Sequence, residues 1–599
     1  MRGMGAGNQP KTEMPTLARR VDLPVPPKAS AILVPRRVSV HVSANIEIAN
    51  NDVHIHTGGT MSDSQDKIAE KISSGRTSLG IEFGSTRIKA VLIDDERNTI
   101  ATGDYGWQSH LVDGLWSYDV DKIWRGLQSV YADVADRVEA QYGQKLVRIG
   151  QIGFSAMMHG YLAFNEDGEL LVPFRTWQNT NTSEAHERLS QLFQYNIPER
   201  WSIAHLYQAV LNDEPHIGSV RYFTTLAGYV HWKLTGRKVL GVGDASGMFP
   251  IDPQTKTYEQ DFIEQFDALP EVAAQPWKLE DLLPEPLVAG TPAGELTAEG
   301  AALLDPSGVL QPGVALAPPE GDAGTGMVAT NSVRRRTGNV SAGTSIFATV
   351  VLEHKLSTLR PEVDLVTTPA GDLAGMSHAN NFTSDLNAWI NLFREFAQLN
   401  GGSVSDADLY GELFRSAISE QADPDAGGML AYPFRTGEFL AGLAEGRPLF
   451  VREPEARFNL ANFMRAQLFG AFSPVTIGMN VMTHDEGVQI DSLVGHGGIF
   501  ATPVVAQRIL AAAFDTPIRV MTTASEGGAW GMAVLAGYLR HADTLLADYL
   551  DDVVFANAQS VTEDPQSADV EGFRMFFARF MQALPVERTA VECMPIGAE

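Results

Sequence analysis

Apolar and polar residues alternate most clearly in two places along the chain. Residues 79–83 (LGIEF) and 88–94 (IKAVLID) are rich in Ile and Val and flank the short stretch GSTR, which is typical of two strands joined by a tight turn. Residues 338–352 (GNVSAGTSIFATVVL) repeat this arrangement. The pattern therefore predicts a β-hairpin with a small, hydroxyl-bearing tip at the head of each half of the chain.

Other segments show apolar residues at three- and four-residue spacing, which predicts amphipathic helices. A short apolar run, VRIGQIGFSAM, predicts a buried strand at residues 147–157. Helices are expected at residues 119–143, 182–195, 224–236, 324–330 and 568–584, the third of them closed by Gly236. Strands and helices mixed in this order predict an α/β protein.

Length and charge limit the function. A chain of 599 residues is too long for one core and suggests two large domains. Lys plus Arg number 45 against 73 Asp plus Glu, a net charge of −28, which disfavours nucleic acid and anionic membrane as partners. No apolar run approaches the ~18–20 residues needed to span a bilayer. Cys593 is the only cysteine, which excludes an intrachain disulfide and fits a cytoplasmic location.

Both predicted hairpin tips could bind phosphate oxygens through backbone N–H groups and hydroxyls. Other nucleotide and nucleophile motifs do not fit: the chain has no G-x-x-x-x-G-K-[ST] run, GVGDASG at 241–247 has the wrong spacing for a dinucleotide fingerprint, and GFSAM at 153–157 lacks the closing glycine of a nucleophile elbow. Two turns at the heads of two domains suit a nucleotide bound between them, with a divalent cation offsetting its charge.

Eight segments, in order, resemble the motifs of the FGGY carbohydrate kinases, and most of all those of xylulokinases. They are GIEFGSTRIKAVLID, SAMMHGYLAF, FRTWQNTNT, KLTGRKVLGVGDASGMFPID, EGDAGTGM, NVSAGTSIF, AYPFRTGE and VGHGGIFATPVVAQRILAAAF, the last accompanied by EGGAWGMAVLAG. The resemblance runs from about Leu79 to Leu539. It implies a two-domain actin/hexokinase-like (ribonuclease H-like) α/β fold with an interdomain cleft, and a kinase that uses ATP and Mg²⁺.

The same resemblance implies a division of the chain and a reaction. We expect an N-terminal extension (1–75), a domain binding sugar and phosphate (76–320), a domain that starts with the catalytic base and binds ATP (321–545), and a helical tail (546–599). The extension is proline-rich and basic; a disordered tail, a start assigned too early and a targeting peptide are the alternatives. The expected reaction phosphorylates the terminal hydroxyl of a ketopentose, D-xylulose first, with L-ribulose, another ketose or gluconate as alternatives.

The resemblance also assigns site residues. Asp322 matches the general base, although an aspartate there could simply cap a helix. Sugar-binding residues are expected at Met158, His159, Trp177, Asn179, Asn181 and Asp322. Nucleotide-binding residues are expected at Ser85, Thr86, Arg87, Gly343, Thr344, Gly497 and Gly498. Glu82, where the family usually has aspartate, and Asp322 are expected to hold Mg²⁺, which keeps several waters and tolerates the longer side chain.

Two departures and two alternatives complete the expectation. Asn179 and Asn181 stand where xylulokinases have an acid and an arginine, which puts the exact sugar in doubt but not the reaction type. A non-catalytic, actin-like nucleotide-binding sensor is the alternative from another class. The expected partners are a small-molecule sugar and ATP, without nucleic acid or membrane; the C-terminal helix would dock on the body of the protein or form a homodimer contact.

Overall fold

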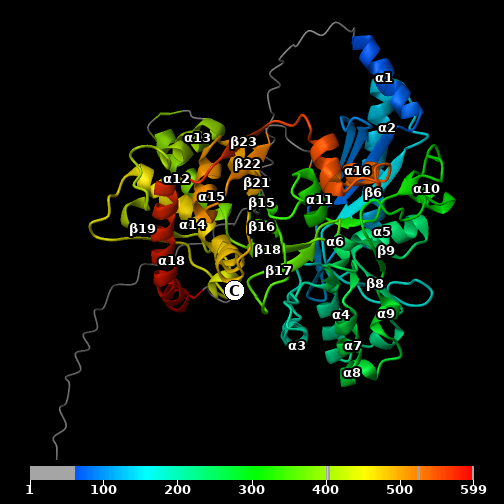
Figure 1. The fold of residues 1–599 in the computed structure, drawn as a ribbon, viewed down its shortest axis with the longest axis horizontal. Helices are drawn as coiled ribbons and strands as arrows, with labels where there is room; N and C mark the ends of the chain where they lie inside the picture. The colour runs from blue at the N-terminus through cyan, green and yellow to red at the C-terminus, as the bar shows by residue number, and fades with distance from the viewer. Residues whose placement is uncertain (1–60, 400, 403–404, 522–526, 596–599) are drawn as a thin grey trace, which may run out of the picture. The chain divides into compact units, whose positions relative to one another are not determined.

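The computed structural model describes residues 61–399, 401–402, 405–521 and 527–595 (Figure 1). The predictions about residues 1–60 therefore lie outside the described residues. The described chain begins with helix α1 (Met61–Ser73), as the polar–apolar pattern after Met61 suggests. Lys71 in its last turn forms ion pairs with Asp94, Asp95 and Glu96, which fixes the end of this helix beside the first hairpin.

The predicted first hairpin is confirmed as part of a six-stranded N-terminal sheet. Its strands run β13-β6-β1-β2-β3, and β14 also pairs with β6. β6 runs parallel to its partners β1, β13 and β14, whereas β2 runs antiparallel to both β1 and β3. Their bounds are β1 (Thr77–Phe83), β2 (Arg87–Asp94), β3 (Thr99–Gly106), β6 (Gln151–Ala156), β13 (Ala315–Leu316) and β14 (Glu320–Gly321).

Helices cover both faces of the N-terminal sheet. On one face lies α2 (Val120–Tyr142), where a Cβ on Gly103 would meet the carbonyl oxygen of Val130 at 2.1 Å. On the other lies α16 (Gly528–Tyr538), where a Cβ on Gly80 would meet the carbonyl oxygen of Ala529 at 2.1 Å. Glycine at these two strand positions lets helix backbone approach sheet backbone directly.

Further helices and short ladders extend this part of the molecule. The predicted helices over 182–195 and 224–236 are confirmed as α3 and α5, and Gly236 ends α5 with φ of 75°. The helices are α3 (Ser183–Phe193), α4 (Ser202–Leu211), α5 (Leu226–Thr235), α6 (Val242–Ala245), α7 (Gln260–Asp267), α8 (Pro270–Ala273), α9 (Leu279–Leu282), α10 (Ala298–Leu304) and α11 (Asp322–Ala329). The ladders pair β4 (His110–Val112) with β5 (Leu115–Ser117), β7 (Leu162–Phe164) with β8 (Tyr222–Thr224), β9 (Val239–Gly241) with β12 (Glu285–Leu287), and β10 (Ile251–Asp252) with β11 (Thr257–Tyr258).

The second predicted hairpin is also confirmed, within a seven-stranded C-terminal sheet of order β17-β18-β16-β15-β21-β22-β23. β15 is antiparallel to β16 and parallel to β21, as β1 is to β2 and β6. The strands are β15 (Thr337–Ala342), β16 (Ile346–Val351), β17 (Asp364–Thr367), β18 (Leu373–Ala379), β21 (Ser492–His496), β22 (Ile518–Met521) and β23 (Ser560–Glu563), with β19 (Met429–Tyr432) and β20 (Leu449–Arg452) paired apart.

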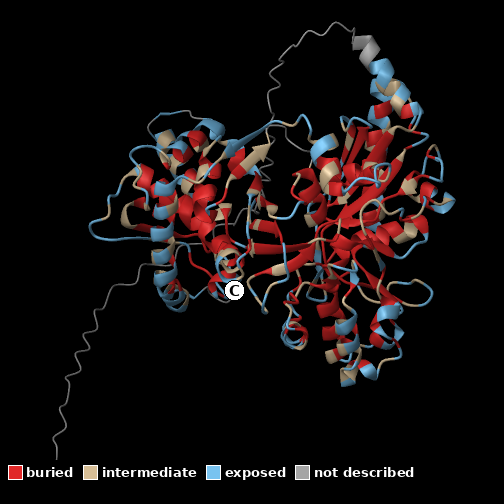
Figure 2. Cartoon of the chain, viewed as in Figure 1, coloured by how far each residue is buried: buried red, intermediate tan, exposed pale blue. Residues whose placement is uncertain are grey.

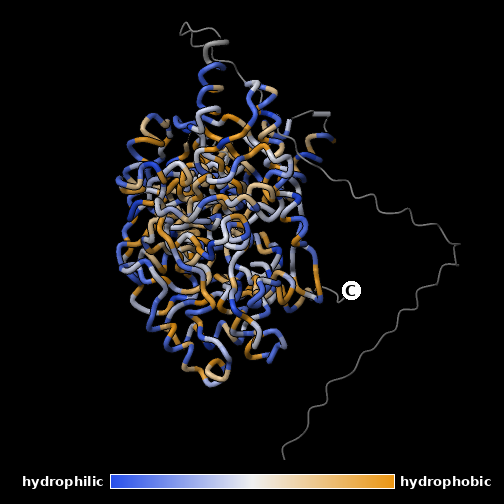
Figure 3. Tube along the Cα trace, turned by 90° about the vertical axis from the view of Figure 1, so that its right-hand side faces the viewer, coloured by the Kyte–Doolittle hydropathy of each residue, from blue (hydrophilic) through white to orange (hydrophobic). Residues whose placement is uncertain are grey.

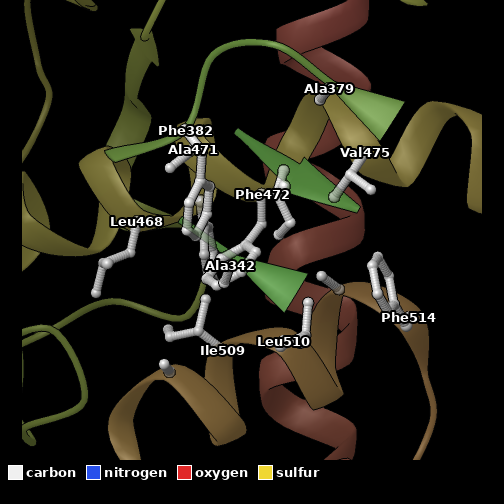
Figure 4. Close-up of a cluster of buried hydrophobic side chains, with 14 of the residues drawn as sticks. Ala342, Ala379, Phe382, Leu468, Ala471, Phe472, Val475, Ile509, Leu510 and Phe514 are labelled. Atoms are coloured by element: carbon white, nitrogen blue, oxygen red, sulfur yellow. The ribbon is translucent and has the colours of Figure 1, made fainter. Parts of the chain in front are cut away.

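A buried helix lies against one face of the C-terminal sheet. α14 (Leu460–Asn480) is buried almost throughout, and Figure 4 shows Leu468, Phe472 and Val475 of this helix beside Ala342 and Ala379 of the sheet. The other helices here are α12 (Thr383–Leu399), α13 (Asp406–Ser416), α15 (Val505–Phe514) and α18 (Ser567–Cys593). Buried residues follow the strands and the helix sides that face them (Figure 2), and hydrophilic residues follow the outside of the trace (Figure 3).

Packing does not follow chain order near the C-terminus. α16 and α17 (Leu546–Tyr549) share a hydrophobic cluster with the helices around the N-terminal sheet, whereas α18 packs on α14 and α15 (Figure 1). The segment predicted as a tail, 546–599, is therefore divided between the two sheets, and its long helix is part of a core. In the described residues, no helix combines the length and hydropathy that crossing a membrane would need.

Candidate active site

Asp322 lies at the first position of α11, directly after the two-residue strand β14. Its Oδ1 accepts a hydrogen bond from the backbone N–H of Met158 at 3.3 Å, and this bond together with the N–H groups of Asp322 and Ala323 acts to lower the pKa of the carboxyl. The residue keeps solvent-accessible surface, yet the surrounding protein raises the pKa of the carboxyl by desolvation. A helix start thus holds an oriented carboxylate that a small molecule can reach.

Glu82, the last polar residue of β1, lies close to Asp322. Burial, followed by the charge of Asp322, raises its pKa to about 7, while Lys89 and the N–H of Ala529 act in the opposite direction. A Cβ on Gly528 would lie 2.1 Å from Glu82 Oε1. The glycine-rich start of α16, which belongs to the EGGAWGMAVLAG segment of the family resemblance, therefore packs on the predicted metal ligand.

Two further buried carboxyls lie beside Asp322, and the sequence interpretation missed them. Glu320 accepts hydrogen bonds from the N–H groups of Gly243 and Asp244, and burial, then the charge of Asp244, raises its pKa to about 8. Asp244 accepts from Thr225 Oγ1 at 2.6 Å, and burial, with the charge of Asp322, raises its pKa to about 7. Both lie inside segments that the family resemblance quoted, so an acidic residue within a glycine-rich run was the available signal.

His159 and Met158 lie in the loop after β6. His159 has a φ of 69° and is followed by Gly160 with a φ of 93°, so the backbone turns at these two residues. Its Nδ1 lies 3.1 Å from the carbonyl oxygen of Gly247, which can only accept, so Nδ1 carries the proton. Burial, with the charge of Arg200, lowers its pKa to about 3. The neutral ring therefore offers Nε2 as an acceptor for a hydroxyl.

The other predicted sugar-binding residues differ in their exposure and in whether the protein already occupies their hydrogen-bonding atoms. Trp177 is half-buried and packs against the core of the N-terminal sheet. Asn179 is buried: its Oδ1 accepts from the N–H of Trp116 at 2.8 Å, and its Nδ2 donates to the carbonyls of Trp116 and Thr176. Asn181 is exposed. The hydrogen-bonding atoms of Asn179 thus fix the backbone of β5, leaving Trp177 and Asn181 free to meet a ligand.

The first hairpin turn presents Ser85 and Thr86 but not Arg87. Ser85 is half-buried and Thr86 exposed, whereas the Arg87 guanidinium extends along the sheet to an ion pair with Asp104 at 2.9 Å. Lys89, which was not predicted, is the direct cross-strand neighbour of Glu82. Its ammonium is thus better placed than Arg87 to add positive charge beside the acidic residues.

The second turn and the second glycine pair come together. Gly343 and Thr344 are exposed at the tip between β15 and β16. Gly497 has a φ of 115°, and a Cβ there would lie 2.0 Å from the carbonyl oxygen of Ala342. Gly498 has open space around its Cβ position. Four predicted nucleotide residues, which follow the neighbouring strands β15 and β21, therefore lie together where these two strands end.

The residues fit a divalent cation held mainly by water and phosphate. In the described part of the chain, no group of three or more His, Cys, Asp or Glu side chains is arranged to hold a metal. Glu82 and Asp322 are two carboxyls close enough for the charge of one to raise the pKa of the other, a repulsion that a bound cation would relieve. This suits Mg²⁺, which commonly takes one or two carboxylates together with waters and substrate phosphates.

Comparison with known proteins identifies the family. The model of the FGGY family of carbohydrate kinases, N-terminal domain, matches residues 77–306, and that of the C-terminal domain matches residues 338–540. The chain belongs to the FGGY family of carbohydrate kinases. The predicted actin/hexokinase-like fold is confirmed by the structure of a gluconate kinase from Lactobacillus acidophilus, with a TM-score of 0.69 at 16% identity over 86% of this chain and 98% of that one.

Curated relatives of this FGGY family member match it over shorter stretches. A xylulose kinase from Lactococcus lactis is 23% identical over 198 residues, 32% of this chain and 39% of that protein. A glycerol kinase from Thermococcus gammatolerans is 25% identical over 212 residues, 32% of this chain and 42% of that protein. The chain thus aligns with about two fifths of the length of these relatives. The names of the gluconate kinase, the xylulose kinase and the glycerol kinase give three different phosphate acceptors.

Proposed function

We propose that this FGGY protein is an ATP-dependent kinase that transfers the γ-phosphoryl group to the terminal hydroxyl of a ketopentose, with D-xylulose as the first candidate. The observation that carries the proposal is the Asp322 carboxyl, which is open to solvent and oriented by the N–H of Met158, the residue that precedes the neutral His159. A positioned carboxylate that can accept the proton of an alcohol is what phosphoryl transfer requires of a base.

The residues have separate parts in the proposed reaction. His159 Nε2 accepts a hydrogen bond from a sugar hydroxyl, and Trp177 covers the C–H side of the sugar. Asp322 takes the proton from the attacking hydroxyl. Backbone N–H groups and hydroxyls of the two turns, with Lys89, hold the phosphate oxygens. Mg²⁺ at Glu82 and Asp322 would neutralise charge on the phosphates.

A coupled ADP-release assay tests the proposal. The panel contains D-xylulose, L-ribulose, gluconate and glycerol, and we expect the greatest kcat/KM with a ketopentose. Asp322→Asn should lower turnover by about 10²- to 10⁴-fold while leaving ATP affinity unchanged. Asp167→Asn, on an exposed loop, is the matched control and should keep full activity.

Three results would contradict the proposal. ATP binding without sugar-dependent ADP release would favour the non-catalytic sensor. Near-normal turnover of Asp322→Asn would remove this residue from the chemistry. Strong preference for gluconate or glycerol would keep the reaction type and replace the acceptor.

A further inference from the structure

The C-terminal sheet carries a stacked aromatic pair on the face opposite α14. Phe347 of β16 and His378 of β18 are register partners, and their rings lie 4.0 Å apart at an angle of 4°. The neighbouring residues Ile346, Ala348 and Ala379 belong to the buried core that packs on α14. Because side chains alternate along a strand, Phe347 and His378 point to the other side, and both keep part of their surface accessible.

The His378 imidazole has hydrogen-bonding atoms to spare. Among the residues that the structure describes, neither ring nitrogen has a hydrogen-bond partner. Burial, with the charge of Arg200, lowers its pKa to about 3, so the ring is neutral near pH 7 and offers one N–H donor and one acceptor. Its contact with Phe347 fixes the plane of the ring. A fixed polar ring without a protein partner is suited to a ligand.

Arg200 connects this ring to the proposed acceptor site. It directly precedes Trp201, whose indole stacks on His159 at 6.2 Å between ring centroids. The positive charge of Arg200 acts on both His159 and His378. Arg200 is thus linked to His159 through Trp201, and to the strand of His378 through Asp364, whose register partner Met376 lies two residues before His378.

The charge of Arg200 is already matched. Its guanidinium pairs with Asp364, the first residue of β17, and the other carboxylate oxygen of Asp364 accepts from Asn196 Nδ2 at 3.0 Å. An acceptor bound beside His378 would therefore meet imidazole nitrogens that bind hydroxyls and an Arg200 guanidinium whose charge Asp364 already neutralises.

We propose that His378 is a second acceptor-binding residue, and that His159, His378 and the Arg200–Asp364 pair select a neutral polyhydroxylated substrate over a sugar acid. This inference rests on the proposed kinase function and deepens it. The base, Asp322, follows β14 of the N-terminal sheet, whereas His378 lies on the C-terminal sheet. His378 therefore hydrogen-bonds a different hydroxyl of the acceptor from the one that is phosphorylated. Its removal therefore weakens acceptor binding and leaves the chemistry unchanged.

His378→Phe tests this role, because phenylalanine keeps the stacking on Phe347 and deletes both ring nitrogens. We expect the KM for the ketopentose to rise about five- to tenfold, with kcat and the KM for ATP within twofold of wild type. His378→Gln, which restores a donor and an acceptor, should recover part of the loss. His354→Ala is the control, because His354 is exposed and follows strand β16 of the same sheet. An unchanged ketopentose KM in His378→Phe overturns the proposal.

Calorimetric titration of the ketopentose separates this inference from the proposed function. If wild type binds the sugar but releases no ADP, the kinase function fails, while a weaker Kd in His378→Phe still supports the binding role. An equal Kd in the two proteins overturns it.

Charge matching is tested with a ketopentose and an aldonic acid of equal length. Wild type should favour the ketopentose in kcat/KM. Asp364→Asn leaves Arg200 unpaired and should shift the acid-to-ketose ratio several-fold toward the acid. A wild-type preference for the acid, or an unshifted ratio in Asp364→Asn with an unchanged melting temperature, overturns this part of the proposal.

Discussion

The two hairpin turns are built alike, but they hold different chemistry. In each, the N–H of the leading glycine closes the turn at 2.9 Å, and a side chain donates to that glycine's carbonyl at 2.7 Å: Trp107 Nε1 to Gly84, and Thr383 Oγ1 to Gly343. The carbonyl oxygen of the leading glycine in each turn is thus already hydrogen-bonded, which leaves the hydroxyls and the remaining N–H groups of the turn for a ligand.

The surroundings of the two turns differ. The strand before the first turn carries Glu82, which lies close to Asp322 and opposite Lys89. The strand before the second carries Ala342, against which Gly497 packs without a side chain. One hairpin topology therefore lies beside charged side chains in one sheet, to which we assign proton and metal chemistry in our proposal, and beside a close backbone contact in the other.

The largest expected effect concerns the core behind the second turn. Asp569 of α18 is buried and pairs with Arg465 of α14 and Arg508 of α15. Asp569→Ala leaves buried guanidinium charge unpaired and should lower the free energy of unfolding by about 3–5 kcal/mol. Chemical denaturation measures it. A loss below about 1 kcal/mol would mean that α18 is not an essential part of this core.

The acidic surroundings of the first turn predict a pH-dependent difference. The folded pKa of Asp244 is raised from 3.8 to about 7, so the folded state binds more protons between about pH 4 and 7. Its contribution to stability therefore falls as pH rises through that window. Asp244→Asn keeps the bond from Thr225 and removes this titration.

Thermal denaturation of wild type and Asp244→Asn should be compared at pH 5 and pH 8. We expect the variant to gain stability relative to wild type as the pH rises, by an amount on the order of a few kcal/mol at pH 8. A constant difference between the two proteins across this range would show that the carboxyl does not titrate as described.

Gly497→Ala tests the neutral surroundings of the second turn. The added Cβ meets the Ala342 carbonyl at a positive φ, so the turn must shift. We expect the KM for ATP to rise about tenfold or more, while the affinity for sugar stays near wild type. Gly218→Ala, where the Cβ position is open, serves as the control. Unchanged ATP kinetics would separate this glycine from nucleotide binding.

The smallest effects should come from the two matched anchors. Trp107→Phe and Thr383→Val each remove one donor to a turn carbonyl, a change worth about 0.5–1.5 kcal/mol. We expect each variant to raise the KM for ATP two- to fivefold without changing the sugar KM. If only one of the two variants raises the KM for ATP, the two turns contribute unequally to binding the ATP phosphates.

Local sequence determined much of this protein. Alternating apolar residues flanking GSTR and GTS predicted both hairpins, because strand period and turn chemistry act over a few residues. Asp322 could be placed at a helix start, and Gly236 at a helix end, for the same reason. The family resemblance supplied the expectation that Asp322, His159 and the glycine turns lie in one site.

Only the tertiary structure decided how charges and neighbours combine. The register of β1 with β2 places Lys89 opposite Glu82, whereas the Arg87 guanidinium reaches Asp104, two positions along β3 from its own register partner, Gly106. The position of α6 beside β14 buries Asp244 and Glu320, and α16 reaches β1 from the far end of the chain. Charge pairing and desolvation depend on which residues meet in space, from Glu82 and Lys89 on neighbouring strands to Gly80 and Ala529 in distant parts of the chain, and no local pattern contains those distances.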